Sequence, residues 1–256
     1  MSSFAENVPR RFVDDPYLVL KSYPESPLAE RYRRLRLRIE QETPSDPVRS
    51  QVTVITSAIP GEGKTTTATN LALAYAEDTT RRTLLIGADL RRPSMSRYIT
   101  PLPTLGLSHV LAGEASLDDA LIEMSDSSLW VLPAGPPDNG SIDLLRQRAL
   151  GHVMDELRRR FQRIVIDAPP TVPFTDAAVL ASHADGALLV VRAGFSTPAL
   201  IRRARESLSG LKVLGVVLND VVFTFVDRYY YGYDDIEPGG RSYAQKREQY
   251  AGVNVS

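Results

Sequence analysis

A glycine-rich loop between an apolar run and a helix-like stretch constrains the fold of this chain more than any other feature. It reads Ser57-Ala58-Ile59-Pro60-Gly61-Glu62-Gly63-Lys64-Thr65-Thr66. Glycines let backbone N–H groups approach phosphate oxygens, and the N-terminus of the following helix adds a positive dipole end. Lys64 is expected to reach the β- and γ-phosphates, and the Thr65 hydroxyl to ligate Mg²⁺. The loop therefore predicts a nucleotide site built from Gly61, Glu62, Gly63, Lys64, Thr65 and Thr66.

The loop departs from the strict G-x-x-x-x-G-K-[ST] pattern, because Ala58 stands in place of the first glycine. A plain glycine-rich turn before a helix is the alternative interpretation. The position of the loop, after a buried strand and at the start of a helix, favours phosphate binding.

Strand-like and helix-like segments alternate from residue 51 onward. Runs that are apolar throughout indicate strands buried on both faces, which is typical of parallel sheets. The pattern predicts an α/β fold of the P-loop NTPase type, a doubly wound, mostly parallel sheet with helices on both faces. The expected strands are 51–57, 83–88, 129–132, 163–167, 186–192 and 213–218, and the expected helices are 64–77, 106–123, 141–160, 175–182 and 197–209.

The chain divides into three predicted parts. Residues 1–27 are polar and rich in proline, and we expect a flexible arm that needs a partner to become ordered. Residues 28–220 form the nucleotide-binding domain and open with a helix marked by Leu28, Tyr32, Leu35 and Ile39. Residues 221–256 form a flexible tail that holds six of the eleven tyrosines.

Composition excludes several classes of protein. The absence of cysteine excludes disulfides, thiolate zinc sites and cysteine nucleophiles. A net charge of −1 argues against a dedicated nucleic-acid binder. No apolar run approaches the ~20 residues that span a bilayer, and the N-terminus does not resemble a secretory signal. We therefore expect a cytoplasmic protein.

Two further strand ends place carboxylates near the loop. Asp167 ends the run Arg163–Asp167, and Asp89 follows the run Leu84–Ala88. An acid after a strand is often a turn residue or a helix cap. In a protein with a phosphate-binding loop, Asp167 is better explained as the Walker B acid that holds Mg²⁺. Asp89 is expected at the same edge of the sheet.

Over residues 28–220 the sequence resembles the bacterial tyrosine kinases (BY-kinases) of capsule and exopolysaccharide export. The segments that carry this resemblance are the loop Ser57–Thr65, the A-D-L-R-R-P block Ala88–Pro93, the I-D-A-P-P segment Ile166–Pro170, the stretch Gly186–Asn219, the E-x-x-R-x-x-R pattern of Glu30, Arg33 and Arg36, and a tyrosine-rich tail.

The resemblance implies an ATP- and Mg²⁺-dependent kinase that autophosphorylates on tyrosine and regulates polysaccharide polymerisation and export. Lys64, Asp89 and Asp167 would be catalytic; Thr65, Asp89 and Asp167 would hold the metal, and Asn219 would contact adenine. Glu30, Arg33 and Arg36 would pack subunits into a ring. The tail residues Tyr229, Tyr230, Tyr231 and Tyr233 would accept phosphate from a neighbouring subunit.

The resemblance also implies partners outside the chain. These are a separate transmembrane co-polymerase that activates the kinase and a tyrosine phosphatase. Through the first, a cytoplasmic chain would lie at the inner face of the plasma membrane. The arginine-rich helix around Arg33 has two other interpretations, contact with an anionic membrane surface and an ordinary solvated face.

One position departs from the family pattern. The family's Walker A′ motif reads D-x-D, its first Asp is thought to act as the base toward the tyrosine, and Gly87 stands there in this chain. A positioned base contributes typically ~10²–10⁴-fold, so glycine predicts slow transfer. The alternatives are a kinase-impaired ATP-binding scaffold and, ranked last, a MinD/ParA-type positioning ATPase, whose early loop lysine is replaced here by Ile59.

Overall fold

The computed structural model describes residues 9–43, 50–136 and 148–221. The chain divides into a compact unit of Met1–Asn219 and a second unit of Asp220–Ser256, of which only Asp220 and Val221 are described. In the described residues of the first unit, a seven-stranded sheet has the strand order β5-β6-β3-β7-β2-β8-β9. Neighbouring strands are parallel except for β5, which runs antiparallel to β6. The predicted α/β class is confirmed.

Six of the seven strands match the segments predicted from apolar runs. They are β2 (Gln51–Ser57), β3 (Thr83–Gly87), β6 (Leu129–Leu132), β7 (Arg163–Asp167), β8 (Gly186–Arg192) and β9 (Val213–Asn219). β2, β3 and β7 form the middle of the sheet and are almost entirely buried, which explains their continuous apolar runs. The short edge strand β5 (Ile122–Glu123) was not predicted.

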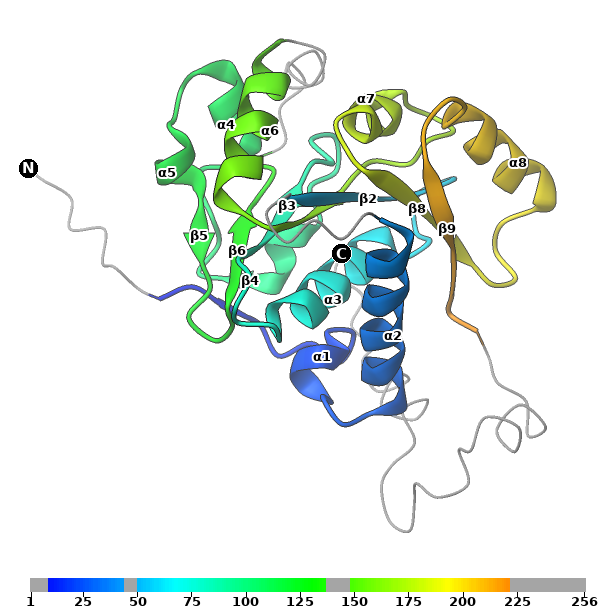
Figure 1. Cartoon of the computed structure of the whole chain (residues 1–256), viewed down its shortest axis with the longest axis horizontal. Helices are drawn as coiled ribbons and strands as arrows, with labels where there is room; N and C mark the ends of the chain where they lie inside the picture. Colours follow the sequence, from blue (N-terminus) through cyan, green and yellow to red (C-terminus); the bar gives the residue numbers. More distant parts are fainter. Residues whose placement is uncertain (1–8, 44–49, 137–147, 222–256) are drawn as a thin grey trace, which may run out of the picture. The chain divides into compact units, whose positions relative to one another are not determined.

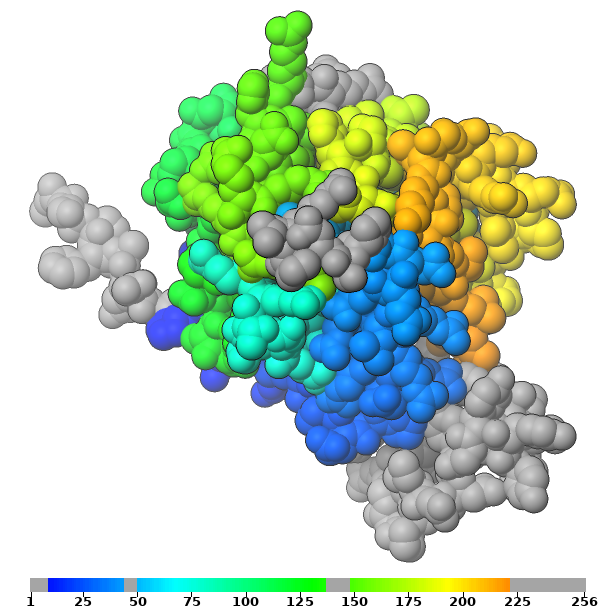
Figure 2. Space-filling model, viewed as in Figure 1, coloured from blue at the N-terminus to red at the C-terminus, as the bar shows by residue number. Residues whose placement is uncertain are grey.

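Helices cover both faces of the sheet (Figure 1). One layer holds α1 (Val19–Ser22), α2 (Pro27–Glu42) and α3 (Lys64–Ala76). The other holds α4 (Leu107–Ala112), α6 (Arg148–Arg160), α7 (Asp176–Ser182) and α8 (Pro198–Ser207), with the short α5 (Leu117–Ala120) beside α4. In the space-filling view α2 lies next to the β9 edge of the sheet (Figure 2).

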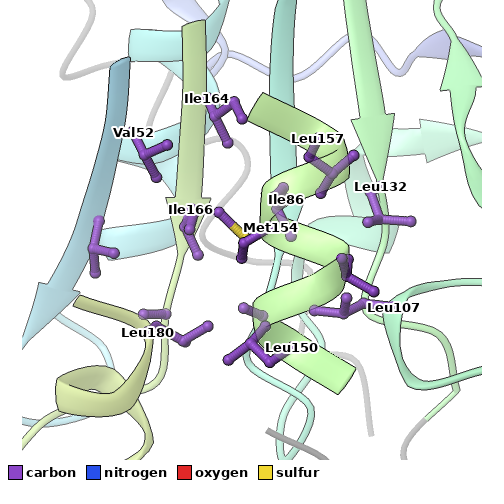
Figure 3. Packing of buried hydrophobic residues seen from close by; sticks show 14 of the residues in the cluster. Val52, Ile86, Leu107, Leu132, Leu150, Met154, Leu157, Ile164, Ile166 and Leu180 are labelled. Carbon is purple, nitrogen blue, oxygen red and sulfur yellow. The ribbon is translucent and has the colours of Figure 1, made fainter. Parts of the chain in front are cut away.

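The two layers bury separate hydrophobic clusters. The cluster under α6 joins Met154 and Leu157 of the helix to Ile86, Ile164 and Ile166 of the sheet (Figure 3). The opposite cluster joins β-strand residues to the apolar residues of α3, which is buried on nearly every side. This double burial fixes the ends of β2, β3 and β7, where the site residues lie. Within the described residues no helix has the length and hydropathy of a membrane span.

The prediction of one continuous helix over 106–123 is wrong. The chain forms α4 and α5 instead, because Gly113 ends α4 in the left-handed conformation (φ 75°). Ser116 then starts α5 with a capping box, in which its hydroxyl and the Asp119 carboxylate each accept a hydrogen bond from the other residue's backbone N–H. Of the predicted helix 141–160, the structure describes residues 148–160, and these are helical.

The predicted flexible arm differs from the structure over residues 9–27. β1 (Arg11–Phe12) pairs with β4 (Ile99–Thr100), and Phe12 and Leu18 are 1% and 0% exposed. The Asn70 side chain of α3 donates to the backbone carbonyl of Tyr17 and accepts from Leu20 N–H. Buried apolar residues and backbone hydrogen bonds thus order a segment whose polar composition suggested disorder.

Candidate nucleotide and phosphoryl-transfer site

The glycine-rich loop has the backbone that its sequence predicts. Gly61 and Gly63 have φ values of 87° and 89°, a region that residues with side chains rarely adopt. A Cβ on Gly63 would lie 2.1 Å from the Asn219 side chain. Gly63 is also the N-cap of α3 and has no side chain to cap it. The first N–H groups of a 13-residue helix therefore face the loop with their positive dipole end, as phosphate binding requires.

Lys64 and Asp89 form a buried ion pair beside the loop. Lys64 Nζ donates to Asp89 Oδ2 at 2.8 Å, and the two side chains are 11% and 6% exposed. Asp89 Oδ1 also accepts from Arg92 N–H at 3.0 Å. The sequence placed these residues at one edge of the sheet, and the structure brings them into contact.

Asp167 lies at the end of β7, opposite Gly87 of β3 and Ile55 of β2 in the sheet register. Complete burial raises the pKa of its carboxyl to about 6, although the nearby Lys64 ammonium and a hydrogen bond from Thr65 lower it. Its Oδ1 atom is buried and has no hydrogen-bond partner among the described residues. An unpaired buried carboxylate oxygen is costly unless a cation or donor joins it. With the Thr65 hydroxyl and the Asp89 carboxylate, it offers the hard oxygen ligands that Mg²⁺ prefers.

A short 3₁₀ helix, η1 (Met95–Tyr98), closes one side of the site and was not predicted. The Ser94 hydroxyl before it lies 2.8 Å from Thr65 Oγ1, and the Tyr98 hydroxyl lies 3.0 Å from Thr66 Oγ1. Arg97 donates to the Tyr98 hydroxyl at 2.8 Å. The only sequence signal for this element was its position directly after the Ala88–Pro93 block.

Met95 occupies the space next to Gly87. A Cβ built on Gly87 would lie 2.4 Å from Met95 Cε and 3.0 Å from the backbone nitrogen of Ala134. A small pocket beside it is lined in part by Gly87, Met95, Asp89 and Asp167. Glycine therefore stands where the family has the first Walker A′ Asp, and the Met95 side chain fills the space next to it.

The Glu62 and Asn219 side chains hold the loop. Glu62 is fully buried; Oε2 accepts from Ile59 N–H at 2.8 Å and Oε1 from the Ser196 hydroxyl at 2.6 Å. Asn219 Nδ2 donates to the Glu62 carbonyl at 2.9 Å. Both residues were predicted to bind the cofactor; their side chains make structural contacts here, and an adenine contact by Asn219 stays a prediction.

The predicted oligomerisation residues make contacts within the chain. Arg33 donates to the Glu77 carboxylate at 2.7 Å, and Glu30 lies 3.8 Å from Arg33. Arg36 donates to the Ala74 carbonyl at 2.6 Å, near the C-terminus of α3. Arginines at this position complement the negative end of the helix dipole. The predicted phosphoacceptors Tyr229, Tyr230, Tyr231 and Tyr233 lie outside the described residues.

Curated relatives cover most of the chain, although no protein-family model matches it. Tyrosine-protein kinase YwqD of Bacillus subtilis is 33% identical over 221 residues, which cover 85% of this chain and 92% of that protein. Tyrosine-protein kinase CpsD of Streptococcus agalactiae is 37% identical, covering 73% and 83% of the two chains. Succinoglycan biosynthesis transport protein ExoP of Rhizobium meliloti is 36% identical over 80% of this chain but only 26% of its own length.

Solved structures agree with these relatives. The chimerical protein CapA2B2 superimposes with a TM-score of 0.74 at 32% identity, covering 82% of this chain and 92% of that one. The BceF tyrosine kinase domain gives 0.70 at 28% identity, covering 78% and 81%. MinD of Pyrococcus horikoshii, complexed with Mg-ADP, gives 0.55 at 27% identity, covering 66% and 70%.

The parallel sheet, the phosphate-binding loop and the carboxylates beside Lys64 define a P-loop nucleotide-binding protein. Its relatives specify the family: the chain belongs to the bacterial tyrosine kinases. The predicted resemblance and the predicted class of enzyme are confirmed.

Proposed function

We propose that this chain is an ATP-dependent protein-tyrosine autokinase that regulates the polymerisation and export of a capsule or exopolysaccharide. The observation that carries the proposal is the contact of Lys64 with Asp89 at the N-terminus of α3, beside Asp167, whose buried Oδ1 atom has no partner among the described residues. Relatives named as tyrosine-protein kinases and as a polysaccharide transport protein support it.

The residues of the site suit phosphoryl transfer, which depends chiefly on positioning and charge stabilisation. The loop backbone and Lys64 bind the β- and γ-phosphates of ATP. Thr65, Asp89 and Asp167 would hold Mg²⁺, which neutralises developing negative charge on the phosphates when bound. The tyrosine oxygen forms a bond to the γ-phosphorus as the bond to ADP breaks, and the hydroxyl proton passes to water or to a neighbouring carboxylate.

The proposed acceptors are Tyr229, Tyr230, Tyr231 and Tyr233 of a neighbouring subunit. Full-length protein incubated with γ-labelled ATP and Mg²⁺ is expected to become labelled on tyrosine, and replacement of these four tyrosines by Phe is expected to remove most of the label. Tyr17, 42% exposed near the start of α1, offers the matched control Tyr17→Phe, which should label normally. Persistent labelling of the four-Phe variant would contradict these four tyrosines as the acceptors.

A kinase-impaired scaffold is the second candidate function, and Gly87 with Met95 is the observation that favours it. Such a protein binds ATP and assembles but transfers phosphate poorly. If ATP binds to the wild type and no tyrosine label appears, the scaffold is correct and the autokinase is wrong.

The likeness to ExoP and to the CapA2B2 chimera supports a membrane partner. We infer a separate transmembrane co-polymerase as activator, a tyrosine phosphatase that reverses the modification, and a location at the inner face of the plasma membrane. Fractionation of cells with and without the co-polymerase tests this location, because the chain should leave the membrane fraction when the partner is missing.

The E-x-x-R-x-x-R residues are proposed to form subunit contacts in a ring. Arg33→Ala with Arg36→Ala is expected to lower the particle mass measured by light scattering. Glu77→Gln is the matched control, because it removes the ion pair that Arg33 makes within the chain and leaves both arginines available to another subunit. If Glu77→Gln lowers the mass as much as the arginine variant does, the arginines act by joining α2 to α3, and the ring contact is wrong.

A further inference from the structure

The turn after β8 presents an exposed aromatic ring beside the phosphate-binding loop. Phe195 is 48% exposed, and a Cβ on Gly61 would lie 3.9 Å from its ring. Arg192 lies with its guanidinium carbon 5.3 Å from the ring centroid. Exposed single aromatic residues are common, so exposure alone carries no inference. What distinguishes Phe195 is how the turn is held.

The buried Glu62 carboxylate joins this turn to the loop. Its Oε2 accepts from Ile59 N–H in the loop, and its Oε1 accepts from the Ser196 hydroxyl and from Arg192 N–H in the turn. The Ala193 N–H donates to the Asn219 carbonyl at 2.9 Å, which ties the turn to the end of β9 as well. The backbone on both sides of Phe195 is therefore tied to the loop and to β9.

The helix that follows the turn carries a basic outer face. α8 begins at Pro198, and its spacing places Arg202 and Glu206 opposite the buried Ala204, with Arg203 and Arg205 on the two flanks of the helix. All four are exposed, and the three arginines form no ion pair with another residue that the structure describes. In the space-filling view α8 lies at the margin of the visible face, beside β9 (Figure 2).

We propose that Phe195 and the arginines of α8 (Arg202, Arg203 and Arg205) form the docking surface for the tyrosine-rich segment 227–237 of a second copy of this chain. This inference rests on the proposed autokinase function and adds the residues that would recognise the substrate. The segment reads DRYYYGYDDIE, with four tyrosines, four acids and one arginine. Stacking of a tyrosine on Phe195 would hold the segment at the loop, where the γ-phosphate is transferred.

The acidic end of the segment and α8 have comparable lengths. Asp234, Asp235 and Glu237 follow Tyr233 by one, two and four residues. An extended chain advances about 3.3 Å per residue, so these acids reach ~13 Å beyond the tyrosine. From Pro198 to Arg205 the helix rises ~10 Å at about 1.5 Å per residue. With a tyrosine on Phe195, an acidic end of this length can follow α8 from the turn toward Arg205.

Binding of a fluorescent peptide of residues 227–237 to the full-length protein tests the surface directly, without requiring transfer. Arg202→Glu with Arg203→Glu is expected to weaken the peptide affinity roughly tenfold, and Phe195→Ala roughly fivefold, while the KM for ATP stays unchanged. The matched control is Arg148→Glu with Arg159→Glu, which reverses two exposed charges on α6 and should leave the peptide affinity unchanged.

The outcomes separate the two proposals. If the wild type binds the peptide but never phosphorylates it, the autokinase function fails and the docking surface stands. If the wild type does not bind the peptide, or if the surface variants bind it as well as the α6 control does, the docking surface is wrong. The α8 variant can also be tested on vesicles of anionic phospholipid. If Arg202→Glu with Arg203→Glu loses binding to the vesicles but keeps the affinity for the peptide, the α8 arginines contact a membrane and the proposal is overturned.

Discussion

Lys64→Met is expected to lower tyrosine phosphorylation by at least about a hundredfold, measured as the initial rate of label transfer from γ-labelled ATP. Removal of a single donor that stabilises transition-state charge typically costs ~10²–10³ in rate. Lys64 is one of four lysines in a chain with 30 basic residues, and it lies at the first position of α3. Retention of the wild-type rate would show that the loop is not the site of transfer.

The same substitution is also expected to lower the free energy of unfolding. Lys64→Met leaves the buried Asp89 carboxylate without the ammonium 2.8 Å away. Breaking a buried ion pair by removing one partner costs about 3–5 kcal/mol. The control is Lys64→Met with Asp89→Asn, which removes both charges and should recover most of the stability but none of the activity. Chemical denaturation of the three proteins thus separates loss of catalysis from loss of fold.

Most of the sheet could be predicted from the sequence, because the physical signal is local and strong. Strands such as β2 and β7 are buried on both faces, so the residues between their ends are apolar or small, and the predicted ends of both match the structure. The error in 106–123 has a local cause as well. Gly113 and the Ser116 cap lie inside a run that is otherwise apolar at helical spacing, and the left-handed turn outweighs the periodicity.

The ordering of residues 9–27 could not be predicted, since it depends on partners that are distant in sequence. Phe12 is buried because β1 pairs with β4, where its register partner Ile99 lies 87 residues further along the chain. Asn70 of α3 then fixes the backbone of Tyr17 and Leu20. Neither contact leaves a pattern in the segment itself, which reads as polar and rich in proline.

In the site, too, some features could be predicted from local motifs, and others depend on contacts between distant segments. The backbone of the loop and the Lys64–Asp89 pair follow from the motifs. The use of the Glu62 side chain to hold the loop, and the contacts of η1 with Thr65 and Thr66, depend on segments that meet only in three dimensions. Glu62 belongs to the phosphate-binding motif and was predicted as a ligand, but its side chain holds the backbone of the loop in place.

Gly87→Asp with Met95→Ala is expected to raise the rate of tyrosine phosphorylation by about 10²–10⁴-fold over the wild type, the range that a positioned general base supplies. Gly87→Asp alone should gain much less. Its new Cβ would lie 2.4 Å from Met95 Cε and 3.0 Å from the Ala134 nitrogen, and Met95 is 2% exposed. Forcing extra atoms into such a packed position typically costs ~1–3 kcal/mol. Met95→Ala removes the side chain that fills this space.

Charge imposes a second condition on this gain. Gly87 lies opposite Asp167 in the parallel register of β3 and β7, so the new carboxylate adds negative charge next to a buried acid. Like charges at short range disfavour ionisation of both groups, and a bound cation relieves the repulsion. The double variant should therefore bind Mg²⁺ more tightly and need less of it than the wild type to reach half of its maximal rate. A magnesium titration of both proteins measures this difference.

Three variants separate the contributions of the two positions: Met95→Ala alone, Gly87→Asp alone and the pair. Met95→Ala alone should lose stability, because deleting a buried Met side chain typically costs ~2–5 kcal/mol, and it should transfer phosphate no faster than the wild type. If Gly87→Asp alone reaches the rate of the double variant, Met95 moves aside easily and does not block a carboxylate at position 87. A double variant no faster than the wild type would show that a carboxylate at position 87 is not what limits this kinase. In that case Asp89 and Asp167 already supply what the transfer requires, and the glycine is a tolerated change within a working kinase.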